Sequence, residues 1–358
     1  MPHNRTTFSK FIIEDQRRRT NPDADLTALL NDIQTACKFI ASAVSRGALD
    51  RSTAATSAGI PGAAERATLR DTATEIMLRE CESGGKLQGM VFEDAEGPYL
   101  ISPDYPRGRH FLVFDALDGS SNLDVNVTVG TIFGVLRGPS GIENPTVDDF
   151  LQPGSRQVAA GYALYGPTST MVITIGSGVH GFTLDREIGA YTLTHPDMRI
   201  PEQTREFSVD ASNERFWELP IQHYVHECVA GRAGLRGDDF NMRWVDSLVV
   251  EVNRILMRGG LFIDPRDTSD VSKRGRLRLL YDANPMALIV EAAGGAASTG
   301  RERILDVVPA DLHQRTPVIL GSRCEVERLV RLHAEHDRGE ALTFETPLFK
   351  PRSLFRTV

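Results

Sequence analysis

Two aspartates stand three residues apart at the end of an apolar run, in FDALDGSSNLDVNV at 114–127. The pattern predicts that a strand delivers Asp115 and that Asp118 follows on a turn. Two carboxylates this close repel each other unless a cation lies between them, and hard oxygen ligands suit Mg²⁺. The Gly-Ser-Ser that follows leaves backbone N–H groups free to receive a phosphate. The segment therefore predicts a metal ion beside a phosphate; an acidic turn capped by serines is the alternative.

The overall composition is that of a folded globular protein with no general affinity for anions. Of 358 residues, 41% are hydrophobic and 25% are charged, and the formal net charge is −8. A net-negative surface disfavours nonspecific binding to nucleic acid or to a membrane. An anionic substrate must therefore meet local positive charge or metal ions within its site.

The cysteines and the opening residues favour a reducing cytoplasm. The four cysteines form no CxxC pair, so structural zinc is not expected. The first sixteen residues, MPHNRTTFSKFIIEDQ, contain no apolar stretch of the signal-peptide kind. No uncharged apolar run approaches the length of a transmembrane helix. We expect a soluble cytoplasmic protein.

Hydrophobic periodicity predicts the elements that must position the acidic segment. Apolar residues at helical spacing predict a helix over 26–44, and the Ala-, Thr-, Ser- and Gly-rich stretch at 50–70 predicts a loop. Further helices are expected at 71–81, 244–258, 284–295 and 325–335. Strands are expected at 110–115, 127–137, 158–166, 170–176, 261–264 and 317–322. This mixture of helices and strands predicts a layered α/β to α+β sandwich.

The polar segment THPDMRIPEQTRE at 194–206 is the best candidate for a subdomain boundary. It predicts an N-terminal subdomain over 1–200 and a C-terminal subdomain over 201–340, with a tail at 341–358.

The acidic segment also resembles a known family. FDALDGSSNLDVNVTVGTIFGVLR is similar to the signature of class I fructose-1,6-bisphosphatases, in which Pro is usual where Ala116 stands. Other segments that resemble the family follow in the same order, at 150–173, 276–298 and 303–322, and the helix beginning DLTALLNDIQ resembles the family's first helix. The resemblance covers most of 24–330. The DxxDG motif alone is less specific, because inositol monophosphatase-like enzymes share it.

The resemblance implies an αβαβα sandwich, a homotetramer and Mg²⁺-dependent hydrolysis of a sugar bisphosphate, with two or more metal ions per subunit. The implied metal ligands are Glu93, Asp115, the backbone carbonyl of Leu117, Asp118 and Asp282. The implied catalytic carboxylate that orients water is Asp94, beside Glu93. The implied substrate contacts are Asp118, Gly119, Ser120, Ser121 and Arg276. Asp282 replaces the family's usual Glu; it is interpreted as a ligand, with helix capping as the alternative.

The chain departs from the family at a loop and at the pocket for the second phosphate. Arg70 stands where the family has a loop Asp, so either Asp71 takes over that catalytic role or the acid is lost. Arg243 is kept as a contact from a neighbouring subunit, and Arg276 replaces a Lys. The usual Asn, Tyr, Tyr and Tyr of the distal pocket are replaced by Asp210, Asn213, Trp244 and Asp264. Carboxylates such as Asp210 and Asp264 repel a phosphate unless a cation or proton intervenes.

The N-terminal helix carries a weaker part of the resemblance. Asp25, Leu26 and Thr27 match part of the family's AMP-binding helix, but Arg109 and His110 replace its usual Lys-Tyr pair. These three positions are candidate AMP contacts.

Three functions follow, in order of preference. The first is hydrolysis of fructose 1,6-bisphosphate to fructose 6-phosphate and phosphate, in gluconeogenesis or Calvin-type carbon metabolism. The second keeps the fold but acts on sedoheptulose bisphosphate or a sugar monophosphate, because the distal pocket is altered. The third is a catalytically silent regulatory paralogue.

Overall fold

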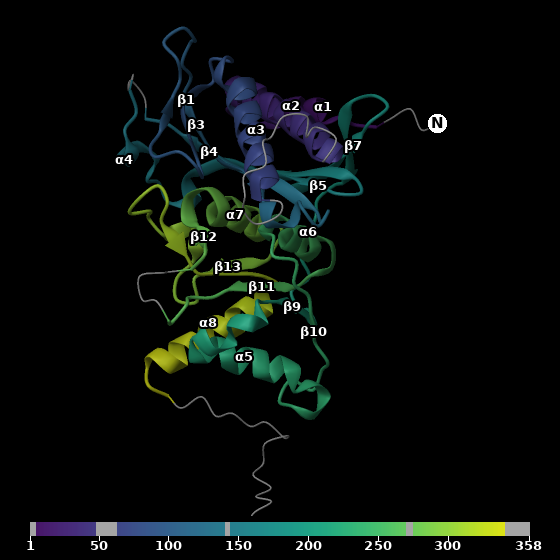
Figure 1. The fold of residues 1–358 in the computed structure, drawn as a ribbon, viewed down its shortest axis with the longest axis vertical. Helices are drawn as coiled ribbons and strands as arrows, with labels where there is room; N and C mark the ends of the chain where they lie inside the picture. Colours follow the sequence, from purple (N-terminus) through teal and green to yellow (C-terminus); the bar gives the residue numbers. More distant parts are fainter. Residues whose placement is uncertain (1–4, 48–62, 140–143, 270–274, 341–358) are drawn as a thin grey trace, which may run out of the picture.

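The chain folds into five alternating layers of helices and sheets (Figure 1). The structure is a computed structural model that describes residues 5–47, 63–139, 144–269 and 275–340. From one end to the other, the layers are helices, a large sheet, two helices, a smaller sheet and two helices. The expected αβαβα sandwich is confirmed.

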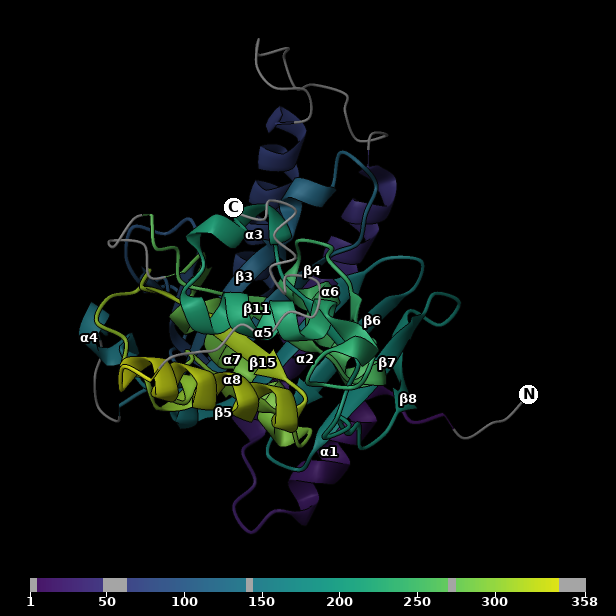
Figure 2. The ribbon, with the colours of Figure 1, turned by 90° about the horizontal axis from the view of Figure 1, so that it is seen from below.

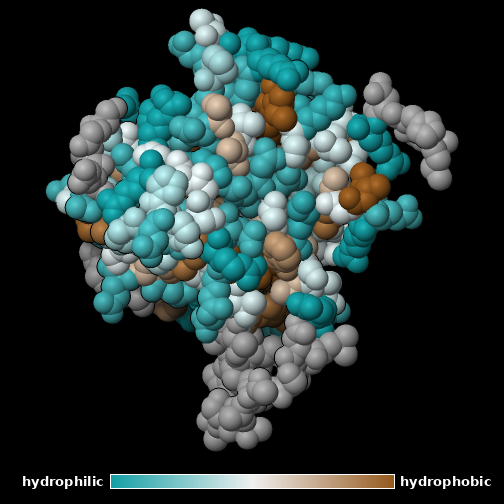
Figure 3. All heavy atoms as spheres, turned by 90° about the horizontal axis from the view of Figure 1, so that it is seen from above, coloured by the Kyte–Doolittle hydropathy of each residue, from teal (hydrophilic) through white to brown (hydrophobic). Residues whose placement is uncertain are grey.

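The first layer contains α1 (Phe8–Arg18), α2 (Ala24–Arg46) and α3 (Ala63–Glu82). Asp23 caps α2 by accepting a hydrogen bond from the backbone N–H of Leu26 at 3.0 Å. The apolar side of α2 is buried against the large sheet, and the outer face of this layer is mostly hydrophilic (Figure 3). The predicted helix at 26–44 lies within α2. The predicted loop at 50–70 is wrong for 63–70, which begin α3; residues 48–62 lie outside the described part.

The large sheet has eight strands in the order β2-β1-β3-β4-β5-β6-β7-β8. All neighbouring pairs are antiparallel except β1 and β3, which run parallel. The strands are β1 (Leu87–Phe92), β2 (Tyr99–Leu100), β3 (His110–Asp118), β4 (Val129–Arg137), β5 (Gln157–Tyr165), β6 (Ser169–Thr174), β7 (Val179–Asp185) and β8 (Ala190–His195). The short helix α4 (Val147–Phe150) lies between β4 and β5 in the sequence.

The middle layer joins the two sheets through one continuous apolar cluster. It contains α6 (Leu248–Arg258) and α7 (Asn284–Ala292), whose buried side chains pack with those of both sheets. A single π-helical turn, η6 (Leu279–Ala283), leads directly into α7. Residues 244–247, which were expected to belong to this helix, precede α6.

The second sheet has the order β10-β9-β11-β15-β13 and is covered on its outer face by α5 (Leu219–Val229) and α8 (Arg323–Asp337) (Figure 2). Its strands are β9 (Glu206–Ser208), β10 (Asn241–Met242), β11 (Leu261–Asp264), β13 (Ala296–Ser298) and β15 (Val318–Gly321). A separate ribbon pairs β12 (Leu277–Arg278) with β14 (Arg315–Thr316). The division near 194–206 stays a prediction, and the tail at 341–358 is outside the described residues.

Within the described ranges, none of the helices combines the length and the apolar character needed to cross a bilayer.

Candidate active site

Asp115 and Asp118 reach the same cavity because the strand that carries them is irregular. Side chains three apart on a regular strand point to opposite faces. Here Asp115 pairs with Ile132 and Asp118 pairs with Gly130, so β3 contains one more residue than β4 between these two pairs. This bulge turns the strand locally. Both carboxylates therefore line one cavity at the end of β3.

Asp118 is anchored against the beginning of α6. Its Oδ2 accepts hydrogen bonds from Ser247 Oγ at 2.7 Å and from the backbone N–H of Val249 at 3.0 Å. The N-terminus of a helix favours a negative charge. Gly119 follows with φ 72, and a Cβ there would lie 2.8 Å from the Cβ of Ser247. The turn that continues into Ser120 therefore needs glycine.

Asp282 comes to the same cavity from the π-helical turn η6. Its Oδ2 accepts a hydrogen bond from the backbone N–H of Arg278 at 2.8 Å. No partner among the described residues reaches its Oδ1, although that atom is buried. Glu93 lies just past β1 and lines the cavity as well, which is possible because β1 and β3 run parallel and end on the same side.

The acidic wall, formed by Glu93, Asp115, Asp118 and Asp282, holds more negative charge than its surroundings balance. Burial raises the pKa of Asp115 well above its ordinary value, and neighbouring carboxylates, Asp282 first, raise it further. Burial also raises the pKa of Asp282, with Asp118 and Glu93 adding to the effect. The pKa of Asp118 is raised by burial even though Ser247 opposes the change. Such mutual repulsion makes this wall a place for a cation.

In this structure an arginine contacts the outer part of the acidic wall. The guanidinium of Arg70, on α3, lies 2.5 Å from Glu93 Oε2 and 2.9 Å from Asp94 Oδ1. Burial would lower the pKa of Arg70, but Glu93 and Asp94 outweigh it and the pKa is raised. Over the described part of the chain, no three His, Cys, Asp or Glu side chains are already gathered as around an ion.

The side chains of the acidic wall nevertheless fit divalent cations. All their donors are carboxylate oxygens, which hard ions prefer. Asp115 has its Oδ1 bound to the backbone N–H of Leu117 at 2.9 Å, much as Asp282 and Asp118 each have one oxygen bound to an N–H group. These bonds fix the carboxylates, and the orphaned Oδ1 of Asp282 is a buried acceptor that needs a positive partner.

The opposite side of the cavity is lined by Trp244, Asp246 and Arg276. We call these three residues, together with Asp264 buried behind Arg276, the distal wall. Asp264 ends β11, and its side chain is 3% exposed. It binds Arg276, whose Nε lies 2.8 Å from Asp264 Oδ1. The guanidinium also lies over the Trp244 ring, 5.5 Å from its centroid. The carboxylate expected to repel a phosphate is thus paired with a cation.

The cavity has a volume of about 290 Å³. Its described lining includes these residues predicted from the sequence: Glu93, Asp115, Leu117, Asp118, Gly119, Ser120, Ser121, Arg276 and Asp282. Asp94, Asp210, Arg243 and Asp264 are not among the described lining residues. Asp71 is not among them either and is exposed on α3, whereas its neighbour Arg70 lines the cavity.

Asp210 and Arg243 have local partners. Asp210 caps the short helix η4 (Ala211–Phe216), and its Oδ2 accepts a hydrogen bond from Asn213 Nδ2 at 2.7 Å. The side chain of Arg243 is 54% exposed and lies 3.8 Å from Glu206.

Besides Arg70, sequence reasoning missed two cations and one acid that line the cavity. Arg278 and Arg315 both line it, on the paired strands β12 and β14, and Asp246 lines it just before α6. A signal for Arg278 was present, because it is two residues from Arg276 and alternation places both on one face of a strand.

The three candidate AMP contacts lie at the start of α2. Leu26 is buried, and Thr27 Oγ1 donates to the carbonyl of Asp23 at 3.1 Å. Asp25 forms an ion pair with Arg109 at 3.3 Å. AMP binding stays a prediction.

Comparisons with known proteins agree over almost the whole chain. Residues 6–196 match the family "Fructose-1-6-bisphosphatase, N-terminal domain", and residues 200–334 match "Fructose-1-6-bisphosphatase, C-terminal domain". "Fructose-1,6-bisphosphatase class 1" of Methylacidiphilum infernorum (isolate V4) is 57% identical over 99% of both chains. The protein of the same name from Hydrogenophilus thermoluteolus is 53% identical over 98% of this chain and 97% of its own.

A solved structure supports the same family assignment. The Leishmania major fructose-1,6-bisphosphatase in holo form has a TM-score of 0.82 and 35% identity, over 92% of this chain and 99% of its own. The chain thus belongs to the class I fructose-1,6-bisphosphatase family, and it is an enzyme of the phosphoric monoester hydrolase class.

Proposed function

We propose that this protein hydrolyses fructose 1,6-bisphosphate to fructose 6-phosphate and phosphate in a Mg²⁺-dependent reaction. The observation that carries the proposal is the convergence of four carboxylates from β1, β3 and η6 beside the Gly119 turn, in a cavity whose other side holds arginines. Its relatives carry the name fructose-1,6-bisphosphatase.

The acidic wall is the proposed binding place for two or more Mg²⁺ ions. Its ligands would be Glu93, Asp115, the backbone carbonyl of Leu117, Asp118 and Asp282. When bound, Mg²⁺ supplies charge neutralisation at the phosphoryl group and lowers the pKa of a bound water.

The other residues bind and orient the reacting groups. The backbone N–H groups at 119–121 receive the phosphate that is cleaved, as loops that begin a helix do. Asp94 orients the attacking water, with Glu93 beside it. Asp71 would join these two only if it reached the cavity, which it does not line in this structure. Arg276 binds the second phosphate, because a guanidinium offers paired donors to that group. Phosphoryl transfer depends mainly on such positioning and on charge neutralisation.

The proposal also covers assembly and cellular context. Exposed Arg243 reaches a neighbouring subunit of a homotetramer, and Asp210 supports the distal pocket from η4. The enzyme acts in the cytoplasm, in gluconeogenesis or Calvin-type carbon metabolism.

A substrate panel tests the function. Purified protein is assayed for phosphate release from fructose 1,6-bisphosphate, sedoheptulose 1,7-bisphosphate and fructose 1-phosphate, each with Mg²⁺ and with EDTA. We expect the highest kcat/KM for fructose 1,6-bisphosphate and no turnover in EDTA. Activity that survives EDTA, or absence of turnover with Mg²⁺, would contradict the proposal.

The altered distal pocket favours one second candidate, a phosphatase for sedoheptulose bisphosphate or a monophosphate. Equal kcat/KM for fructose 1-phosphate and the bisphosphate would support it, because the second phosphate would then contribute nothing. A catalytically silent paralogue would release no phosphate from any member of the panel.

A further inference from the structure

Two departures from the family pattern form a single structural unit. Asp264 stands where the family usually has Tyr, and Arg276 stands where it has Lys. Asp264 Oδ1 accepts from Arg276 Nε at 2.8 Å, and Asp264 Oδ2 accepts from the backbone N–H of Arg276 at 3.1 Å. Both oxygens of the carboxylate are therefore engaged with the same residue.

The support under this pair is rigid. Asp264 lies at the end of β11 and pairs there with Val318 of β15. On the other side, the carbonyl of Arg276 accepts a hydrogen bond from Arg315 Nη1 at 2.9 Å, next to the β12–β14 ribbon. A charged group fixed at both ends loses little further conformational freedom when it binds a ligand.

The pair leaves one edge of the guanidinium facing the cavity. Nε is taken by Asp264, and the flat face rests on Trp244, whose ring is parallel to that of Phe262 within 2°. Nη1 has only a 3.4 Å contact with Asp246, in which both side chains are 49% exposed. No described residue accepts a hydrogen bond from Nη2. A phosphate dianion can displace the weak contact with Asp246, because exposed ion pairs contribute little.

Asp264 and Arg276 differ in their access to the cavity. Asp264 does not line the cavity, while Arg276 does. Burial would lower the pKa of Arg276, but Asp264 outweighs it and the pKa is raised. The aspartate thus stays behind the arginine and pairs with its charge.

The geometry also explains why Arg and not Lys accompanies this aspartate. A lysine has a single nitrogen, and a lysine held by Asp264 would have to share that nitrogen with a ligand. A guanidinium satisfies Asp264 through Nε and still presents its Nη groups.

We propose that Asp264 is a positioning residue, which fixes Arg276 so that its free edge receives the second phosphate and thereby sets the preference for a bisphosphate. This inference rests on the proposed function. Asp264 itself touches no substrate atom.

Asp264→Asn is the main test, because it keeps the shape of the side chain and removes its charge. We expect KM for fructose 1,6-bisphosphate to rise about 10- to 100-fold, the range of a lost charged hydrogen bond, while kcat stays within about 3-fold. For fructose 1-phosphate, which lacks the second phosphate, KM should change by less than about 3-fold. Asp238→Asn is the matched control, since Asp238 pairs with Arg205 at 2.8 Å in an exposed Asp–Arg pair that does not line the cavity.

Arg276→Lys is a second test variant, in which Asp264 keeps a cationic partner. It should show the same selective rise in KM for the bisphosphate. In the double variant the two effects should not add, because Asp264 acts through Arg276. Equal losses on both substrates, an unchanged KM for the bisphosphate, or additive effects would overturn the inference.

Calorimetric titration with fructose 6-phosphate separates this inference from the proposed function. If the parent protein hydrolyses no member of the panel but binds fructose 6-phosphate, and Asp264→Asn weakens that binding about 10-fold or more, the inference stands without the proposed reaction. If the parent protein neither hydrolyses nor binds these sugars, both proposals fail.

Discussion

The acidic wall and the distal wall of the cavity both contain buried aspartates, yet they balance charge in opposite ways. On the distal wall, both oxygens of Asp264 are bound to Arg276. On the acidic wall, burial and neighbouring carboxylates raise the pKa of both Asp115 and Asp282, and one buried oxygen of Asp282 lacks a partner among the described residues. Excess charge can thus remain unpaired in a site only where a ligand of opposite charge is to bind. Elsewhere the protein must pair a buried charge with one of its own groups.

The largest effect that tests this contrast is expected on the acidic wall. Asp282→Asn removes a charge that repels its neighbours, and the amide oxygen can still accept from the backbone N–H of Arg278. Since even groups behind a metal ligand cost 10- to 100-fold when changed, kcat/KM should fall by more than about 100-fold. The melting temperature of the metal-free protein should stay equal or rise, because repulsion is relieved. A lower melting temperature together with retained activity would contradict the contrast.

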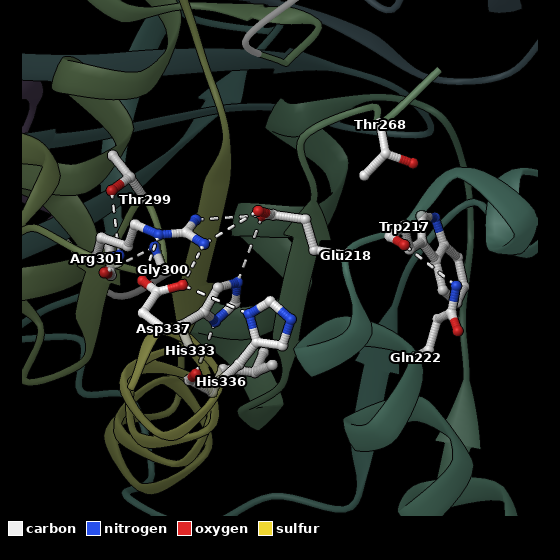
Figure 4. Close-up of polar contacts among 12 residues, drawn as sticks. Trp217, Glu218, Gln222, Thr268, Thr299, Gly300, Arg301, His333, His336 and Asp337 are labelled. Carbon is white, nitrogen blue, oxygen red and sulfur yellow. Dashed lines mark hydrogen bonds and ion pairs between the residues drawn. The ribbon is translucent and has the colours of Figure 1, made fainter. Parts of the chain in front are cut away.

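A third region, far from the cavity, contains paired acidic and basic side chains. The direction in which its contribution to stability changes with pH can be predicted. Glu218 lies before α5, and Figure 4 shows it facing Arg301 and His333. Arg301 Nη2 lies 3.1 Å from Glu218, and its Nε lies 2.7 Å from Asp337. Burial opposes the effect of the contacts with His333 and Arg301 on Glu218, but these contacts outweigh it and lower its pKa from 4.5 to about 2. His336, also on α8, contacts Asp337.

The folded-state pKa of Glu218 is below its unfolded value, so its contribution to stability is complete above about pH 4.5. It is lost as the pH falls toward 2. At neutral pH, Glu218→Gln should destabilise the protein by about 2 kcal/mol, which is less than the full pKa difference implies because solvent screens part of it. Melting temperatures should differ most at pH 7, and the difference should shrink below pH 4.5. Glu214→Gln, at an exposed partner of His226, should show a much smaller difference. A difference independent of pH would contradict the assignment.

The sequence predicted most of the layers because their elements carry strong local signals. The apolar periodicity of α2 and the alternation before Asp115 are such signals. The first part of α3 was mistaken for a loop because it has no apolar stripe and follows a Thr-, Ser- and Gly-rich stretch, although its Ala, Glu and Arg residues favour a helix. The π-helical turn at Asp282 has no sequence rule at all.

The site could be predicted in part. The spacing of Asp115 and Asp118 pointed to a cation, but Glu93 and Asp282 were named only through a family resemblance, because the fold alone brings them near. The ion pair of Asp264 with Arg276 spans twelve residues and depends on β11 and on the β12–β14 ribbon. Reasoning from residue types treated the two as separate anomalies, and only geometry could join them.

The smallest expected effect sharpens the contrast, because it concerns a cation that already touches the acidic wall. Arg70 contacts Glu93 and Asp94 and must leave them before a metal ion can take its place. Arg70→Gln removes this internal competitor, so the affinity for Mn²⁺, measured by calorimetry on metal-free protein, should increase about 5-fold. That is the magnitude of one partly exposed ion pair at close range.

The same substitution should lower the melting temperature of the metal-free protein by a few degrees, because Glu93 and Asp94 then repel each other without a cation between them. Saturating Mn²⁺ should restore it, since a ligand that binds only the folded state stabilises that state. Arg79→Gln is the control: Arg79 is on the same helix but contacts Glu80 and the Phe39 ring. If Arg70→Gln weakens Mn²⁺ binding, then Arg70 organises the carboxylates for the ion instead of competing with it, and the acidic wall is less unbalanced than its buried aspartates indicate.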